Sequence, residues 1–133
     1  MSDPPGTKWL KAARKPPTSK HYQAALRELK LTPQEQYAYQ HHLNNLALGG
    51  VRQPGGKTSS FLNIVTEMDG RHYVLPTVWD NQIVDENTAV ERARKEGLDK
   101  WPSYDSEEAA EARYDAMHGY MERDTMERQR SAR

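Results

Sequence analysis

The dipeptide Asp69-Gly70 stands between two runs of strand-forming residues, and this arrangement limits the fold more than any other feature of the chain. Asp-Gly is a strong signal for a two-residue hairpin turn, because a type I′ turn needs positive φ at both central residues. The run Phe61–Met68 precedes it and the run Arg71–Leu75 follows it. The sequence therefore predicts an antiparallel hairpin. Pro76 should lie at a strand end or edge, because proline has no amide proton to donate.

A second tight turn is predicted at Asp80-Asn81, after Trp79, because both residue types tolerate positive φ. It would send Gln82–Val84 back along the preceding strand. Together the runs predict a small antiparallel β-meander of about three strands.

Helical patterns flank this meander. Residues 21–48 predict two helices, the second opened by a Thr32-x-x-Glu35 capping box and ended by Gly49 and Gly50. After the meander, Asp85 should cap a helix that Gly97 closes, and Asp105 or Ser106 should cap the last one. The stripes expected to face the core are Tyr22, Ala25, Leu26, Leu29; Tyr39, Leu43, Leu46, Ala47; Ala89, Val90, Ala93; and Ala110, Tyr114 (or Arg113), Met117, Met121.

The predicted fold class is α+β: a small meander packed with three to four helices, plus an extended N-terminal arm. We divide the chain into a Pro-rich basic arm (1–20), two helices (21–48), a Gly-rich joint (49–60), the meander with two helices (61–124) and a polar tail that frays (125–133). The arm is interpreted either as a disordered tail or as a strap, meaning an extended segment that binds along the surface of a neighbouring molecule. The candidate partner-binding residues of such a strap are Trp9, Leu10, Lys11, Arg14 and Lys15.

The joint contains Gly-Gly-Lys-Thr, which looks like a phosphate-binding loop. Such a loop needs Gly-x-x-x-x-Gly-Lys-Ser/Thr between a strand and a helix. The position of its first glycine is Val51, a helix precedes the joint and a strand follows it, and Pro54 lacks an amide proton. The segment is therefore interpreted as a helix-to-hairpin joint, and no nucleotide cofactor is expected.

The chain has 133 residues, but only 35% are hydrophobic and the mean hydropathy is −1.02. Part of it should therefore gain order from a partner or from oligomerisation. With 19 basic and 19 acidic residues the net charge is zero, which does not indicate a binder of DNA or of membrane surfaces. There is no cysteine, and no apolar run has the length of a signal peptide or membrane span. We expect the protein to be made in the cytoplasm.

No catalytic set can be nominated from the residue order. His41 and His42 are adjacent, so they point to different sides of a helix and do not chelate one metal ion together. We therefore expect no enzyme activity, no metal and no cofactor. The aromatic residues near the hairpins read either as core or as a ligand-stacking surface, and the core is favoured. They are Tyr73, Trp79, Trp101 and Tyr104.

Three segments in series carry a resemblance: LTPQEQYAYQHHLNNLALGGV, GGKTSSFLNIVTEMDGRHYVLPTVWDNQIV and AVERARKEGLDKWPSYDSEEAAEARYDAMHGYMERDT. Residues 31–125 resemble a module of tailed-bacteriophage virion proteins. That module has a helix ending in Gly-Gly, a short loop, a hairpin, Pro-Thr-Val-Trp-Asp-Gly, a Phe-Pro-Ser-Tyr loop and a Glu/Ala/Arg-rich helix. The corresponding residues here are Gly49-Gly50, Pro54–Ser60, Pro76–Ile83, Trp101–Tyr104 and Glu108–His118. Departures are Asp80-Asn81 for Asp-Gly and Gly55-Gly56-Lys57 for Asp-Gly-Ser.

The resemblance implies a non-enzymatic structural component of the virus particle, with no catalytic residues to carry over. We expect it at the portal-to-tail region, as a homo-oligomer in contact with portal, tail or internal proteins. One alternative is an internal protein ejected with the DNA, whose basic arm could contact phosphates. Another is a wall-binding accessory of a lytic enzyme that stacks sugars on Trp79, Trp101 and Tyr104.

Overall fold

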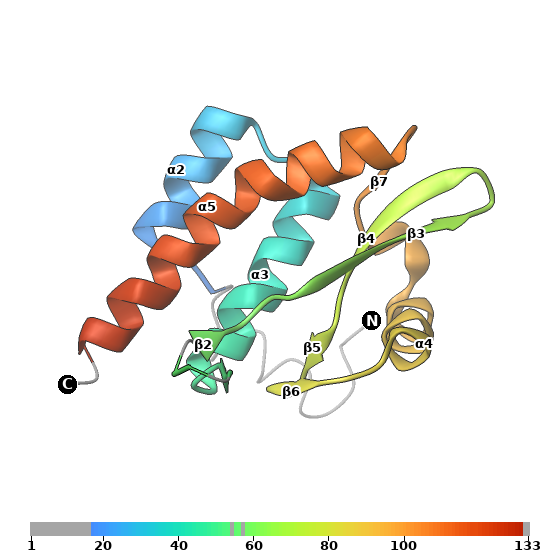
Figure 1. Ribbon diagram of the computed structural model, residues 1–133. Coiled ribbons are helices and arrows are strands. Elements are labelled where there is room, and N and C mark those ends of the chain that lie inside the picture. The colour runs from blue at the N-terminus through green and yellow to red at the C-terminus, as the bar shows by residue number, and fades with distance from the viewer. Residues whose placement is uncertain (1–16, 54, 57, 132–133) are drawn as a thin grey trace, which may run out of the picture.

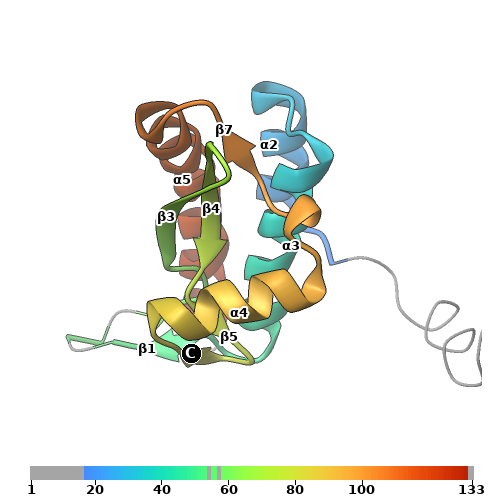
Figure 2. The same cartoon turned by 90° about the vertical axis from the view of Figure 1, so that its right-hand side faces the viewer.

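The computed structural model describes residues 17–53, 55–56 and 58–131. A twisted hairpin runs through the middle of the molecule. In Figure 2 it lies between α5 and α3, and α4 crosses in front of its lower end. The short helix α2 packs beside α5 and α3 (Figure 1). The predicted α+β class is confirmed.

The helices are α2 (Lys20–Leu29), α3 (Pro33–Ala47), α4 (Glu86–Glu96) and α5 (Glu107–Ser131), with a 3-10 turn η1 (Leu98–Lys100). The caps follow the predicted chemistry. The Thr32 hydroxyl accepts from the Glu35 amide and the Glu35 carboxylate accepts from the Thr32 amide, which completes the capping box. Asp85 caps α4 through the Thr88 amide. For the last helix Ser106 is the residue whose side chain accepts a backbone amide, that of Ala109.

The central sheet has the order β3 (Asn63–Met68), β4 (Arg71–Pro76) and β7 (Ser103–Tyr104). The predicted hairpin is confirmed: Met68 pairs with Arg71, and both Asp69 (φ 52°) and Gly70 (φ 79°) have positive φ. The turn at Asp80-Asn81 also forms, joining β5 (Val78–Trp79) to β6 (Gln82–Ile83).

The third strand of the sheet is not the predicted one. β5 and β6 form a separate two-stranded hairpin, and Ser103–Tyr104 takes the place beside β4. Pro76 ends β4 as predicted, and its missing amide proton lies on the side of β4 that faces β7. The Gly-rich joint also contains a small hairpin, in which β1 (Val51–Arg52) pairs with β2 (Thr58–Ser59).

Two predicted boundaries are wrong. Ser19 caps α2 and Lys20 opens it, so these residues belong to the folded body and not to the arm. The chain does not fray at Thr125, because α5 continues to Ser131. Tertiary contacts explain this: Thr125 is buried, and Glu127 bonds to His21 and Lys20 of α2.

The core is built largely from the predicted stripes. Ala47 is an exception, since it is exposed at the end of α3. The buried apolar cluster comprises Tyr22, Ala25, Leu31, Ala38, Tyr39, Leu43, Phe61, Leu75, Trp79, Ala93, Trp101, Met117 and Met121.

Gly50 is the glycine that the fold needs most. It has a φ of +74°, and a Cβ there would lie 2.5 Å from Thr58 Cγ2 and 3.3 Å from the Ser59 carbonyl oxygen. We expect Gly50→Ala to lower the free energy of unfolding by roughly 1–3 kcal/mol, from backbone strain and the clash. Gly119→Ala is the control, because Gly119 is helical and a Cβ there would meet no neighbouring atom within 4 Å. It should stabilise by roughly 0.5–1 kcal/mol. Urea unfolding of both variants measures the difference, and equal effects would contradict this account.

Candidate functional site

The two tryptophans of the motif segments form one buried cluster with His41. Trp79 is 4% and Trp101 1% exposed, and their rings meet edge to face at 5.6 Å. The His41 ring lies 4.6 Å from Trp79 and 5.5 Å from Trp101, and its Nε2–H donates to the Val78 carbonyl at 2.6 Å. Burial lowers the pKa of His41, so its ring is neutral near pH 7. The interpretation of these tryptophans as core is confirmed, and a sugar-stacking surface made from their faces is not available.

Asn45 of α3 joins the two turns that carry the resemblance. Its Nδ2 donates to the carbonyls of Ser60 and Val78, each at 3.1 Å. Its Oδ1 accepts from the Asn81 amide at 3.0 Å, and its own carbonyl accepts from the Gly50 amide. The buried side chain of Asn45 therefore positions the joint against the Asp80-Asn81 turn, and its backbone carbonyl holds the Gly-Gly turn.

Glu35 extends its capping role into a buried ion pair. It is 1% exposed, and Arg113 of α5 donates Nε–H to its Oε2 at 2.7 Å. Tyr104 of β7 donates its hydroxyl to the same oxygen at 2.6 Å, and Arg113 also donates to the Leu29 carbonyl. Burial alone would raise the pKa of Glu35, but the hydrogen bonds from Arg113, Tyr104 and the Thr32 amide hold it below its ordinary value. Burial and the same carboxylate raise the pKa of Tyr104.

A second buried network contains a serine, a histidine and an aspartate. His42 is fully buried, its Nε2–H donates to Asp124 Oδ2 at 3.1 Å, and its Nδ1 accepts from the Ser60 hydroxyl. A carboxylate only accepts hydrogen bonds, which assigns the ring proton to Nε2. Tyr39 donates its hydroxyl to Asp124 at 2.6 Å. Burial lowers the pKa of His42 despite Asp124, and the hydrogen bonds from His42 and Tyr39 outweigh burial to lower the pKa of Asp124.

This Ser60–His42–Asp124 set has the residue types of a hydrolase triad, but its geometry favours a structural role. Ser60 is 2% exposed, so its hydroxyl is closed off from a substrate. The hollow beside it holds about 160 Å³, below the roughly 300–1,000 Å³ of typical small-molecule sites. His42 is neutral and hydrogen-bonded at both ring nitrogens, and it thereby links α3 to α5 and to the joint.

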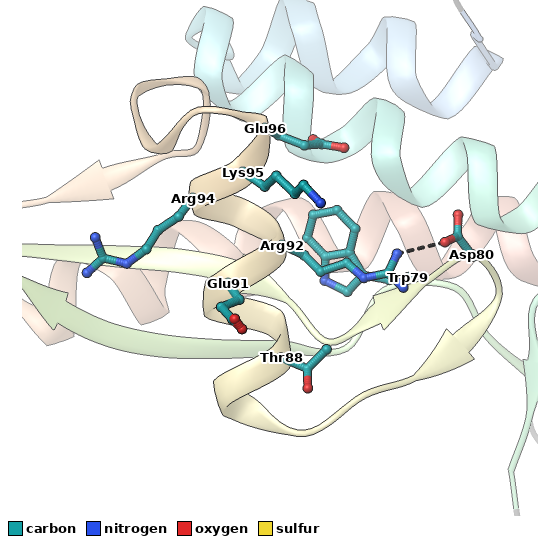
Figure 3. A pocket seen from close by; sticks show the side chains of 8 residues that line it. All are labelled: Trp79, Asp80, Thr88, Glu91, Arg92, Arg94, Lys95 and Glu96. Carbon is teal, nitrogen blue, oxygen red and sulfur yellow. Dashed lines mark hydrogen bonds and ion pairs between the residues drawn. The ribbon is translucent and has the colours of Figure 1, made fainter.

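An open groove of about 840 Å³ lies between α4 and the β5–β6 turn. Figure 3 shows Arg92 reaching across Trp79 to Asp80, with Nη1 and Oδ2 2.7 Å apart. The rim of the groove carries both acidic and basic side chains, so it favours neither an anion nor a cation. The lining residues are Trp79, Asp80, Thr88, Glu91, Arg92, Arg94, Lys95 and Glu96.

Residue order did not reveal the pairs Glu35–Arg113 and His42–Asp124 or the bonds of Asn45. One signal was present. Glu35, His42 and Asn45 lie on the core-facing side of α3, and polar side chains at such positions need buried partners. Which partners they find depends on helix packing. The predicted partner-binding residues Trp9, Leu10, Lys11, Arg14 and Lys15 lie outside the described residues.

Within residues 17–53, 55–56 and 58–131, no group of three or more His, Asp or Glu side chains is placed to hold a metal ion. None of the helices in that part of the chain is both long and apolar enough to span a bilayer. No family model, no curated protein and no solved structure matches the chain at a significant level.

Replacing Glu35 by Gln should lower the free energy of unfolding by roughly 2–4 kcal/mol at pH 7, because Arg113 loses its charged partner. The folded pKa of Glu35 lies below the ordinary value of 4.5. The stabilisation from its charge is therefore complete above that value and is lost as the pH falls through the folded pKa. Urea unfolding of both proteins from pH 7 to pH 3 measures the difference between their free energies of unfolding. That difference should stay constant near neutral pH and shrink at the acidic end. A difference independent of pH would contradict this account.

A serine-directed fluorophosphonate should not label the chain, because the Ser60 hydroxyl is buried and committed to His42. The measurement is intact-mass analysis after incubation, with a known serine hydrolase as positive control. Labelling of the wild type that disappears in Ser60→Ala would contradict the structural interpretation.

Proposed function

We propose that the chain is a non-enzymatic structural component of a tailed-phage virion, at the portal-to-tail region, which assembles through contacts between subunits. The observation that carries the proposal is where the motif residues lie. The segments that carry the resemblance meet at Asn45, at the Trp79–Trp101 cluster and at Glu35. Their side chains hold turns and helices together and do not line a deep pocket.

The buried chemistry supports the non-enzymatic part of the proposal. Glu35 is paired with Arg113, and Asp124 with His42 and Tyr39. These carboxylates are held ionised by internal partners, as in a stability network, and not poised beside an open hollow as catalytic acids or bases are. The mixed-charge groove beside α4 suits a neighbouring protein surface better than a small charged substrate.

The assembly part of the proposal draws on the N-terminal segment. Since Ser19 caps α2 and Thr18 accepts a hydrogen bond from Gln23, the part that can act as a strap lies before Thr18. We propose that residues 1–16, with Trp9 and Leu10 among the basic side chains, contact a neighbouring subunit in the particle.

The test uses the phage that encodes the chain, with its gene deleted and supplied from a plasmid. The full chain should be detected by mass spectrometry in gradient-purified particles and should remain after DNA release. A chain lacking residues 2–16 should fold, by circular dichroism, but be missing from particles. Thr7→Ala, within the same segment, is the control and should be incorporated normally.

Absence of the full chain from purified particles would contradict the virion proposal. Normal incorporation of the shortened chain would contradict the strap. Loss of the full chain on DNA release would favour the internal, ejected protein over the portal-to-tail position.

A further inference from the structure

The strand β3 forms one edge of the central sheet, because β4 pairs with it on one side and β7 lies beyond β4. Two hydrogen bonds show which backbone groups of β3 and β4 point toward a neighbouring strand. The Val74 amide donates to the Pro102 carbonyl at 3.0 Å, so the even-numbered residues of β4 face β7. The Thr77 amide donates to the Leu62 carbonyl at 2.7 Å, so the odd-numbered residues face β3 and the even-numbered residues of β3 face β4.

The amides and carbonyls of Asn63, Val65 and Glu67 therefore point away from the sheet. None of the hydrogen bonds found among the described residues uses these groups. Asn63 and Val65 are half-buried and Glu67 is exposed, so helices do not enclose this edge. In Figure 2, β3 is the outer strand of the hairpin, and α5 lies over its face.

This edge lacks the usual protections against pairing with another chain. Edge strands of soluble proteins usually carry prolines, charged side chains (lysine above all) or bulges, or are very short, and of these β3 has a single charged residue, Glu67. β3 has six residues (NIVTEM), with no proline or lysine, and its register with β4 runs without a bulge from Asn63 to Met68. The opposite edge differs: β7 has two residues, and Arg71 occupies the Ser103 carbonyl.

We propose that β3 pairs antiparallel with β3 of a second copy of this chain, joining the two sheets into one. The free groups set the register, with Val65 opposite Val65 of the other copy and Asn63 opposite its Glu67. Each opposed pair exchanges two backbone hydrogen bonds. This is strand addition to an open edge, with the chain serving as its own partner.

The side chains of β3 fit this occupant. In the proposed register the single charged residue, Glu67, faces an amide that can donate to it and not a second carboxylate. The two valines meet on the twofold axis, and a β-branched pair suits that position. The contact is isologous, so it closes at two copies and uses both β3 edges, and the edges that remain are the two-residue β7 strands.

This inference deepens the self-assembly part of the proposed function and rests on it in that respect alone. It is tested on the purified full chain, so the two can fail separately. A dimer of a chain that is absent from particles would contradict only the virion proposal, and a monomer that enters particles would contradict only the strand pairing.

Sedimentation equilibrium of the full chain over a range of concentrations should show a monomer–dimer equilibrium. Hydrogen exchange should show the amides of Asn63, Val65 and Glu67 protected more at high concentration than at low. Val65→Lys places two ammonium groups on the axis and should abolish the dimer, whereas Val65→Thr, the control, should retain it.

Asn63 provides a matched pair that keeps the test valid if Val65→Lys unfolds the chain. Asn63→Lys places a lysine opposite Glu67 of the other copy at two symmetric positions and should lower the dissociation constant roughly two- to tenfold. Asn63→Glu should raise it by a similar factor. Both differences should shrink in high salt.

A chain that stays monomeric at all concentrations, with the three amides unprotected, would overturn the proposal. Protection of these amides in a monomer would also overturn it, because a segment of the same chain would then occupy the edge. If neither Asn63 variant changes the dissociation constant of the dimer, the register is wrong. If, in addition, Val65→Lys is folded and still dimeric, the β3 contact is overturned altogether.

Discussion

Three buried polar side chains on one helix, α3, constrain the rest of this structure. Glu35, His42 and Asn45 all face the interior, where a polar group without a partner would cost several kilocalories per mole. Each is satisfied by residues distant in the chain: Glu35 by α5 and β7, His42 by α5 and the joint, and Asn45 by the joint and the β5–β6 hairpin. The requirement that all three be bonded at once leaves few arrangements of the surrounding elements.

In the part of the chain that the structure describes, this arrangement places several titratable groups in the interior, where they bond to one another. The titratable groups that look catalytic by residue type are those that hold the helices together. The Ser60–His42–Asp124 set illustrates the point, since the same three residue types serve catalysis only when the hydroxyl reaches a substrate-sized space. Here the neighbouring hollow is small and the serine is closed off.

Two features of the described surface bear on the proposed contacts with partners. The groove beside α4 has mixed charge and a floor that includes Trp79, while the edge of β3 offers backbone groups in a regular row. The second is the more directional, because hydrogen-bond spacing along a strand sets the position of whatever pairs with it. A small module with a modest apolar supply can gain stability from such neighbours.

Local chemistry in the sequence determined much of the fold. The capping box at Thr32–Glu35, the Asp69-Gly70 turn and the Asp80-Asn81 turn all form where they were predicted, because each depends on residues next to one another in the chain. The apolar stripes of α4 and α5 point inward for the same reason of short-range periodicity.

Tertiary structure decided what depends on residues distant in the chain. Residues 125–131 are helical through contacts with α2, although their own sequence is polar and suggests fraying. Ser103–Tyr104 and not Gln82–Val84 completes the sheet, because the loop after η1 brings the Pro102 carbonyl to the Val74 amide. The partners of Glu35 and His42 lie 78 and 82 residues further along the chain, so only the packing of α5 against α3 could bring them together.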